Sequence, residues 1–149
     1  MREEGRALLH RALGGDAARI EFADAVAWYQ SPEHAFQQYS RYVEDHLEQG
    51  APRVRVVAEV IWPQSSETAE VAGWKRYEAG ISPAMPDVPV SFICAYNTQE
   101  LPAEIVMDAR RTNPVLRTAE GAQPSALYSS PAAFVRGLER EVPGLVSDR

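Results

Sequence analysis

The sequence has little of what most catalytic and metal sites are built from. Its 149 residues include one cysteine, Cys94, and three scattered histidines. A single cysteine cannot close an internal disulfide, and no Cys/His spacing matches a metal site. Gly14-Gly15 is followed by Asp16 rather than by a phosphate-loop sequence, and neither GxSxG nor HExxH is present. We therefore expect no metal and no cofactor, so any catalysis would depend on carboxylates alone.

Long apolar runs and positive charge are also scarce. No apolar run reaches the roughly 20 residues that a membrane span requires, and residues 1–13 lack the apolar core of a signal peptide. Fifteen Lys and Arg face 21 Asp and Glu, for a net charge of -6. Such an acidic surface repels phosphate backbones. We expect a cytoplasmic protein that binds neither membranes nor nucleic acid.

What is present is an alternation of amphipathic helices and short apolar strands. This alternation predicts an α/β fold with a mostly parallel sheet flanked by helices in a three-layer sandwich. The length fits one domain, which we assign to residues 1–142, followed by a flexible tail at 143–149. The patterns predict helices over 3–13, 32–48, 66–81, 102–112 and 131–141, strands over 18–24, 53–62, 89–96 and 115–116, and a loop over 121–131.

Glu59 interrupts one of the most apolar stretches of the chain, "VVAEVIW" at 56–62. Such a strand is typical of a sheet covered on both faces, where an ionised carboxylate needs a partner. By the strand period of two, Glu59 shares a face with Val57 and Ile61. Two interpretations stay open: a structural carboxylate bonded to a backbone N–H, Ser, Tyr or Arg, or part of a ligand site at the carboxyl end of the strand.

Glu78 repeats the anomaly on the next helix. It falls on the apolar stripe that Val71, Trp74 and Ile81 define. The alternative is a surface carboxylate that pairs with Lys75, three residues earlier. Two misplaced acids on adjacent elements suggest a site, and two carboxylates close together would raise one pKa. That arrangement suits either acid/base chemistry or a hydrogen-bonded ligand.

Two further polar features lie near the ends of elements. Tyr96 and Asn97 follow a predicted strand, where they could line a site or begin a turn. Arg111 lies near a helix end, where it could offset the helix dipole or act as counter-ion to one of the two acids. An aromatic set around two acids suits a concave pocket with few polar groups. The candidate ligand-binding residues are Glu59, Trp62, Trp74, Glu78, Tyr96 and Arg111.

Four segments in this order resemble a known family: "AEVIW" (58–62), "YEA" (77–79), "ICAYNTQELPAEIVMDARRTNP" (93–114) and "SALY" (125–128). They are similar to the MEDS domain, a sensory domain named after methanogens, methylotrophs and a dichloromethane-responsive repressor. The resemblance is closest to its actinobacterial branch, which accompanies anti-sigma-factor ATPases. Ala58, Asn97 and Asn113 stand where the family pattern has glycine, aspartate and histidine. The family's opening strand, helix and strand have no counterpart in the sequence.

The resemblance implies a regulatory sensor or interaction domain that binds a small, largely apolar ligand or a partner protein in signalling or transcription control. Without the opening elements, a sheet edge and apolar surface would be uncovered, so we expect a homodimer or a regulatory partner. Two alternatives stay open. One is a small enzyme that uses Glu59 and Glu78 as an acid/base pair. The other is a degenerate scaffold that acts through protein contacts, which the changes at Ala58, Asn97 and Asn113 favour. The sequence names neither ligand nor partner.

Overall fold

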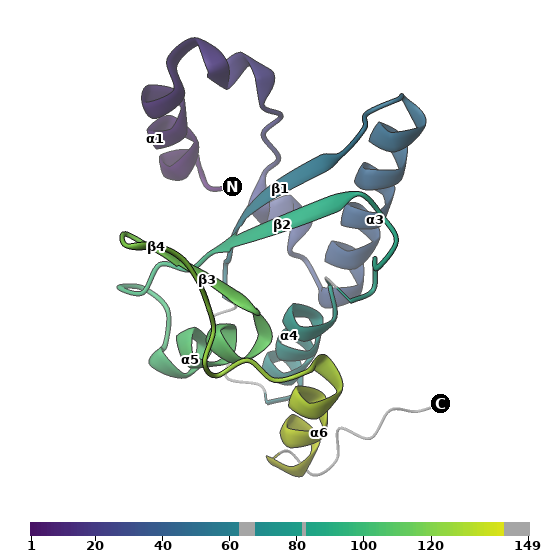
Figure 1. The fold of residues 1–149 in the computed structure, drawn as a ribbon, viewed down its shortest axis with the longest axis vertical. Coiled ribbons are helices and arrows are strands. Elements are labelled where there is room, and N and C mark those ends of the chain that lie inside the picture. The colour runs from purple at the N-terminus through teal and green to yellow at the C-terminus, as the bar shows by residue number, and fades with distance from the viewer. Residues whose placement is uncertain (63–67, 82, 142–149) are drawn as a thin grey trace. The chain divides into compact units, whose positions relative to one another are not determined.

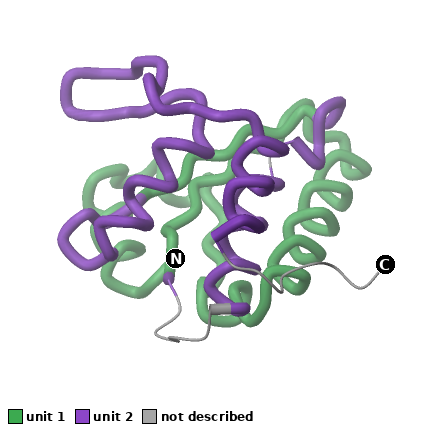
Figure 2. The backbone as a smooth tube through the Cα atoms, turned by 90° about the horizontal axis from the view of Figure 1, so that it is seen from below, with its two compact units in different colours: residues 1–61, 89–95 green, residues 62–88, 96–149 purple. Residues whose placement is uncertain are grey.

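The computed structural model describes residues 1–62, 68–81 and 83–141. The chain divides into two compact units, the first of residues 1–61 and 89–95 and the second of residues 62–88 and 96–149 (Figure 2). The assignment of 1–142 to one domain stays a prediction, and the predicted tail at 143–149 lies outside the described residues.

The first unit is built on two parallel strands, β1 (Val54–Glu59) and β2 (Val90–Ala95). The two strands lie side by side (Figure 1). They pair in register from Val54 opposite Val90 to Glu59 opposite Ala95. Both strands lie within the ranges that the apolar pattern predicts. The connection between them runs through the second unit, as a parallel pair requires a crossover.

Helix α3 (Pro32–Glu48) packs against this sheet. It begins as the sequence predicts, because the Ser31 side chain accepts a hydrogen bond from the backbone N–H of His34 at 3.1 Å. Ala35, Tyr39 and Val43 of the helix are buried, and the ring of Tyr39 meets the ring of Phe92 edge to face at 5.6 Å. One face of the sheet is thus covered by a helix of the same unit.

The opposite face of the sheet is open. Val57 of β1 and Ile93 of β2 are each 53% exposed, whereas Val54 and Ala58, which point to the α3 side, are 7% exposed. The expectation of a strand covered on both faces is therefore wrong for β1. Parallel strands are usually buried on both faces, so two exposed aliphatic side chains on neighbouring strands are unusual.

The predicted strand over 18–24 is absent from the structure. Residues Gly14–Arg19 form a short 3-10 helix, η1, and residues 20–24 have no regular structure before α2 (Ala25–Trp28). The alternating side chains of this segment bind helices instead of a sheet. The ring of Phe22 stacks on His10 of α1 (Glu3–Leu13) at 4.8 Å.

Glu21, in the same segment, is held by α3. Its carboxylate accepts a hydrogen bond from the Tyr42 hydroxyl at 3.0 Å and lies 3.0 Å from His46 Nε2. These bonds lower the pKa of Glu21, and the bond to Glu21 raises the pKa of His46. Burial, aided by Glu21, raises the pKa of Tyr42 to about 12. In this segment, Phe22 contacts α1 and Glu21 contacts α3, although the alternation of the sequence is typical of a strand.

The second unit contains three helices, α4 (Thr68–Gly80), α5 (Ala103–Thr112) and α6 (Pro131–Glu141). Each matches a predicted helix, although residues 66–67 of the first lie outside the described part. Helix α4 packs against both α5 and α6. The side chains that these three helices bury are apolar: Ala72, Trp74, Tyr77, Ala79, Ile105, Ala109 and Leu138.

A hairpin follows α5, formed by β3 (Val115–Thr118) and β4 (Gly121–Pro124). The predicted strand at 115–116 therefore pairs with residues of the predicted loop, in a separate antiparallel sheet. A two-residue turn connects the strands, and Gly121 beyond it has φ of +120°, a conformation that favours glycine. With one parallel and one antiparallel pair among its helices, the described chain has an α/β fold, as predicted.

Candidate functional site

Glu59 is the last residue of β1, and its carboxylate meets the start of α1 within the first unit. Its Oε2 accepts a hydrogen bond from the backbone N–H of Arg2 at 2.8 Å, and its Oε1 lies 2.6 Å from Arg2 Nε. A Cβ added at Gly5 would lie 3.3 Å from Oε2, so the helix approaches the carboxylate closely. Burial alone would raise the pKa of Glu59, but the two bonds and the charge of Arg2 hold that pKa below its ordinary range. The structural interpretation, a carboxylate bonded to an arginine, accounts for this residue.

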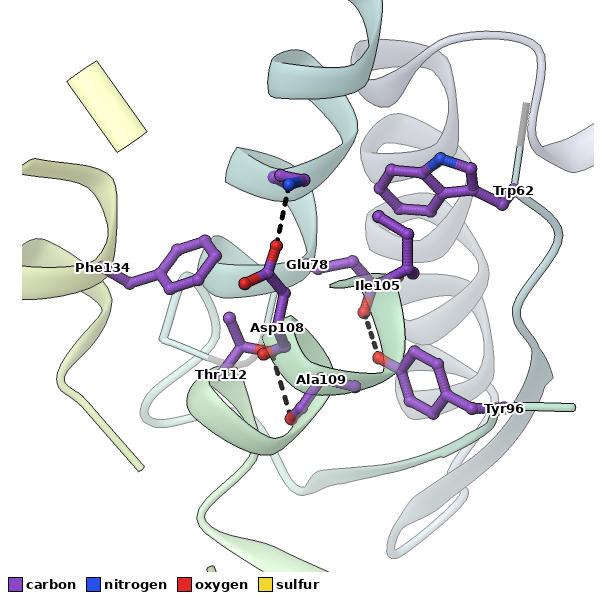
Figure 3. A pocket seen from close by; sticks show the side chains of 9 residues that line it. Trp62, Glu78, Tyr96, Ile105, Asp108, Ala109, Thr112 and Phe134 are labelled. Carbon is purple, nitrogen blue, oxygen red and sulfur yellow. Dashed lines mark hydrogen bonds and ion pairs between the residues drawn. The ribbon is translucent and has the colours of Figure 1, made fainter. Parts of the chain in front are cut away.

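Glu78 has a different environment, in the second unit. Its Oε2 accepts a hydrogen bond from the Tyr96 hydroxyl at 2.7 Å (Figure 3). Part of the residue reaches solvent, but protein atoms surround its carboxyl end. Burial raises the pKa of Glu78 and outweighs the opposing effect of the Tyr96 bond. The neutral form is therefore more favoured than in an ordinary glutamate, and in that form the group can donate as well as accept a hydrogen bond.

Asn113 extends this pair to the end of α5. Its Nδ2 donates to the backbone oxygen of Ala109 at 2.9 Å and lies 3.5 Å from the Tyr96 hydroxyl. Asn97, by contrast, begins a turn, because its side chain accepts the backbone N–H of Gln99 at 3.1 Å. The polar chain of Glu78, Tyr96 and Asn113 thus connects α4, the residue after β2 and the residue after α5.

The hydrogen-bonded side chains of Glu78 and Tyr96 border a small hollow. Figure 3 shows side chains from α4, α5 and α6 converging on it. The enclosed part of the hollow has room for about one water molecule. The hollow is lined by Trp62, Lys75, Glu78, Tyr96, Ile105, Asp108, Ala109, Thr112 and Phe134.

Ion pairs neutralise the charged side chains of the wall. Lys75 Nζ lies 2.9 Å from Asp108 Oδ2 and 3.7 Å from Glu104 Oε1. Arg111 Nη1 lies 3.3 Å from Asp108 Oδ1. The predicted alternatives of a Lys75–Glu78 pair and of Arg111 as counter-ion to either acid are therefore wrong. Asp108 pairs with both Lys75 and Arg111. Glu59 is bonded to Arg2, and Glu78 is bonded to Tyr96.

The structure brings three of the six predicted site residues to the hollow, namely Trp62, Glu78 and Tyr96. Glu59 belongs to the first unit. Arg111 does not line the hollow and pairs with Asp108. Trp74 is buried at 5% exposure, with its ring 5.5 Å from Tyr77 in an edge-to-face contact, and does not line the hollow. Whether these residues bind a ligand stays a prediction.

Sequence reasoning missed most of the α5 wall. The wall residues of α5 are spaced as one helix face, and this spacing is the signal that could have found them: Ile105, Asp108, Ala109 and Thr112. Phe134 carries no comparable signal, since only tertiary packing shows which helix its ring meets. Among the described residues, no group of three or more His, Cys, Asp or Glu side chains could hold a metal ion. No described helix is long and apolar enough to cross a bilayer.

Comparison with known proteins gives one family. Residues 2–114 match the family model described as MEDS, the methanogen/methylotroph, DcmR sensory domain. The matched segment includes the Glu78–Tyr96 pair and Asn113. Neither the curated proteins nor the solved structures gave a match. Because the family match spans well over half of its length, the chain belongs to the MEDS sensory domain family.

Proposed function

We propose that this chain is a regulatory sensor domain whose second unit binds a small, uncharged, largely apolar ligand at the hollow beside Glu78 and Tyr96. Membership of a sensory family supports the regulatory role. The observation that carries the binding site is a hydrogen-bonded carboxyl–hydroxyl pair at a small hollow whose charged wall residues, Lys75 and Asp108, are paired with each other. A few convergent polar groups in an apolar cavity are typical of small-molecule sites.

The chemistry of the hollow favours an uncharged ligand. The charged wall side chains, Lys75 and Asp108, already satisfy each other at 2.9 Å. Burial raises the pKa of Glu78, which favours its uncharged form relative to an exposed glutamate. A protonated carboxyl group and a phenol can both donate and accept hydrogen bonds. The pair can therefore orient one hydroxyl, carbonyl or similar group while the remaining surface takes a short apolar body.

The size of the hollow makes binding a conformational event. A space for about one water molecule holds no organic ligand until its walls part. A ligand that binds only the expanded form shifts the population towards that form, which is how a sensor converts occupancy into a structural signal. The helices that would move are those that form the walls, α4, α5 and α6.

The test is an NMR titration of the full chain with xenon and with the alcohols from methanol to 1-butanol. We expect saturable shifts at the amides of Tyr96, Ala109 and Thr112. Tyr96→Phe should weaken binding of the alcohols and leave xenon binding unchanged, because only the alcohols use the hydroxyl. Tyr128→Phe, at a tyrosine that is 44% exposed, is the matched control. Shifts that are absent, or that never saturate at the hollow, would refute the proposal.

We also infer that the open face of the parallel sheet is covered by a second copy of the chain. Val57 and Ile93 are exposed at its centre. Glu59, two residues after Val57 on the same face of β1, is bonded to Arg2, so the apolar centre is the part of this face left for a partner. A two-fold axis beside Val57 would set this apolar centre against the same centre of a second copy.

A further inference from the structure

One wall of the hollow comes from outside the family match. Eight of the nine lining residues lie within residues 2–114, and Phe134 of α6 is the ninth. Phe134 is also the largest apolar side chain that reaches the hollow from α6 (Figure 3). The segment after residue 114 therefore adds bulk to a site whose polar groups all belong to the family domain.

Contacts at both ends of α6 fix the position of this ring. Before the helix, the backbone N–H of Ser129 donates to the backbone oxygen of Arg111, the last-turn carbonyl of α5, at 2.9 Å. Near the end of the helix, Glu139 Oε1 lies 3.6 Å from Arg76 Nη2 of α4. Leu138 is on the same helix face, four residues after Phe134, and is buried at 6% exposure. These contacts place α6 where the Phe134 ring lines the hollow.

We propose that Phe134 determines which ligands fit this site, by limiting the length of their apolar part. The proposal rests on the proposed function, that the hollow binds a small uncharged ligand. Glu78 and Tyr96 would bind the polar group of the ligand, whereas Phe134 closes the apolar side of the hollow. Phe134 is partly exposed, so removal of its ring should widen the hollow on that side, since the surroundings relax only in part. A widened apolar hollow can accept xenon or a small hydrocarbon.

The experiment compares wild type with Phe134→Ala and Phe134→Leu in the full chain, with Arg136→Ala as a control on the exposed side of α6. Xenon and the alcohols from methanol to 1-hexanol are the probes, and amide shifts of Tyr96 and Ala109 are the readout. We expect Phe134→Ala to bind xenon more strongly at the hollow than wild type. We also expect the longest alcohol that binds to move to a longer chain, with an affinity gain of about tenfold for that alcohol. Phe134→Leu should lie between the two, and it keeps the proposal testable if the alanine variant is unstable.

The outcomes separate this proposal from the proposed function. If wild type binds short alcohols and Phe134→Ala binds the same series with the same affinities, Phe134 sets no limit and the proposal is overturned. If xenon enters the Phe134→Ala hollow but no alcohol binds wild type or variant, Phe134 only fills space. The proposed function then fails together with the selectivity built on it. A change of the same size in Arg136→Ala would also overturn the assignment to the ring.

Discussion

Two glutamates that look alike in the sequence have opposite electrostatic environments. Both interrupt an apolar pattern, yet the pKa of Glu59 is lowered and the pKa of Glu78 is raised. The difference lies in the partner. A guanidinium and a backbone N–H stabilise the ionised form of Glu59, whereas Glu78 has a neutral phenol and a surrounding of protein atoms. The first residue therefore supports structure, and the second is the better candidate for binding.

Replacement of Glu59 should loosen the start of α1. Glu59→Gln keeps the shape but loses the charge that the Arg2 bonds require, at a cost of about 1 kcal/mol for a partly exposed pair. A lowered folded-state pKa gives stability that is present above the ordinary pKa of about 4.3 and is lost as pH falls through the folded value. The difference in unfolding free energy between wild type and variant, from urea titrations, should therefore be clear at pH 7 and shrink near pH 3.

Glu44→Gln, at an exposed position of α3, is the control for the loss of one negative charge. It should leave the stability nearly unchanged at both pH values. An effect of Glu59→Gln that stays constant from pH 7 to pH 3 would contradict the ion pair as its cause.

Replacement of Glu78 should have the opposite pH dependence. A raised folded-state pKa means that the folded protein binds the proton more tightly than the unfolded chain, so stability falls as pH rises between the two pKa values. Glu78→Gln can still accept the Tyr96 hydrogen bond but cannot ionise. The melting temperature of the variant relative to wild type, measured from pH 5 to pH 8, should therefore increase with pH and level off above the folded-state pKa of Glu78. Melting curves that run parallel over this range would show that Glu78 titrates normally.

At the scale of elements, the sequence predicts those helices and strands whose positions are set by neighbouring residues in the chain. The Ser31–Pro32 start of α3 and the apolar runs of β1 and β2 are local signals, and the structure has all three elements. The strand predicted over residues 18–24 is wrong, because the same alternation of apolar and polar residues also suits a segment whose side chains contact two different helices. The hairpin was missed since β4 is short and ends in Pro124, which strand patterns disfavour.

In the candidate site too, the sequence predicts the residues that local patterns place and not the contacts that tertiary packing makes. The rule that polar residues gather at the carboxyl end of a strand predicted Tyr96, and helical periodicity predicted the inward position of Glu78. The bond between them and the arrival of Phe134 from α6 depend on tertiary packing. No spacing in the chain encodes which of several helices will meet. The same holds for Arg111: of its two predicted roles, counter-ion to Glu59 or Glu78 is wrong, since its partner is its own helix neighbour Asp108.

The segment after β4 should stabilise the end of α5. The last carbonyl groups of a helix have no partner within it. Ser125, which is 9% exposed, donates its hydroxyl to the backbone oxygen of Arg110 at 2.5 Å. Ser125→Ala should cost about 1 kcal/mol and increase amide hydrogen exchange of Thr112 and Asn113, because a carbonyl loses its partner. Ser129→Ala is the matched control: its hydroxyl contact is long at 3.4 Å, and its backbone bond to Arg111 survives the change. Equal effects of the two variants would contradict this role.

At the scale of the whole molecule, the open sheet face predicts self-association. Wild type should sediment as a dimer at micromolar concentration, because Val57 and Ile93 are each 53% exposed on strands of a type that is usually covered. Val57→Lys places a charge at the centre of the proposed interface and should give a monomer with an unchanged circular dichroism spectrum. Val26→Lys, at a valine that is 70% exposed on α2, tests for a general effect of a new surface charge and should remain dimeric. A wild type that sediments as a monomer at every concentration would refute the second copy and leave a different protein as the partner for this face.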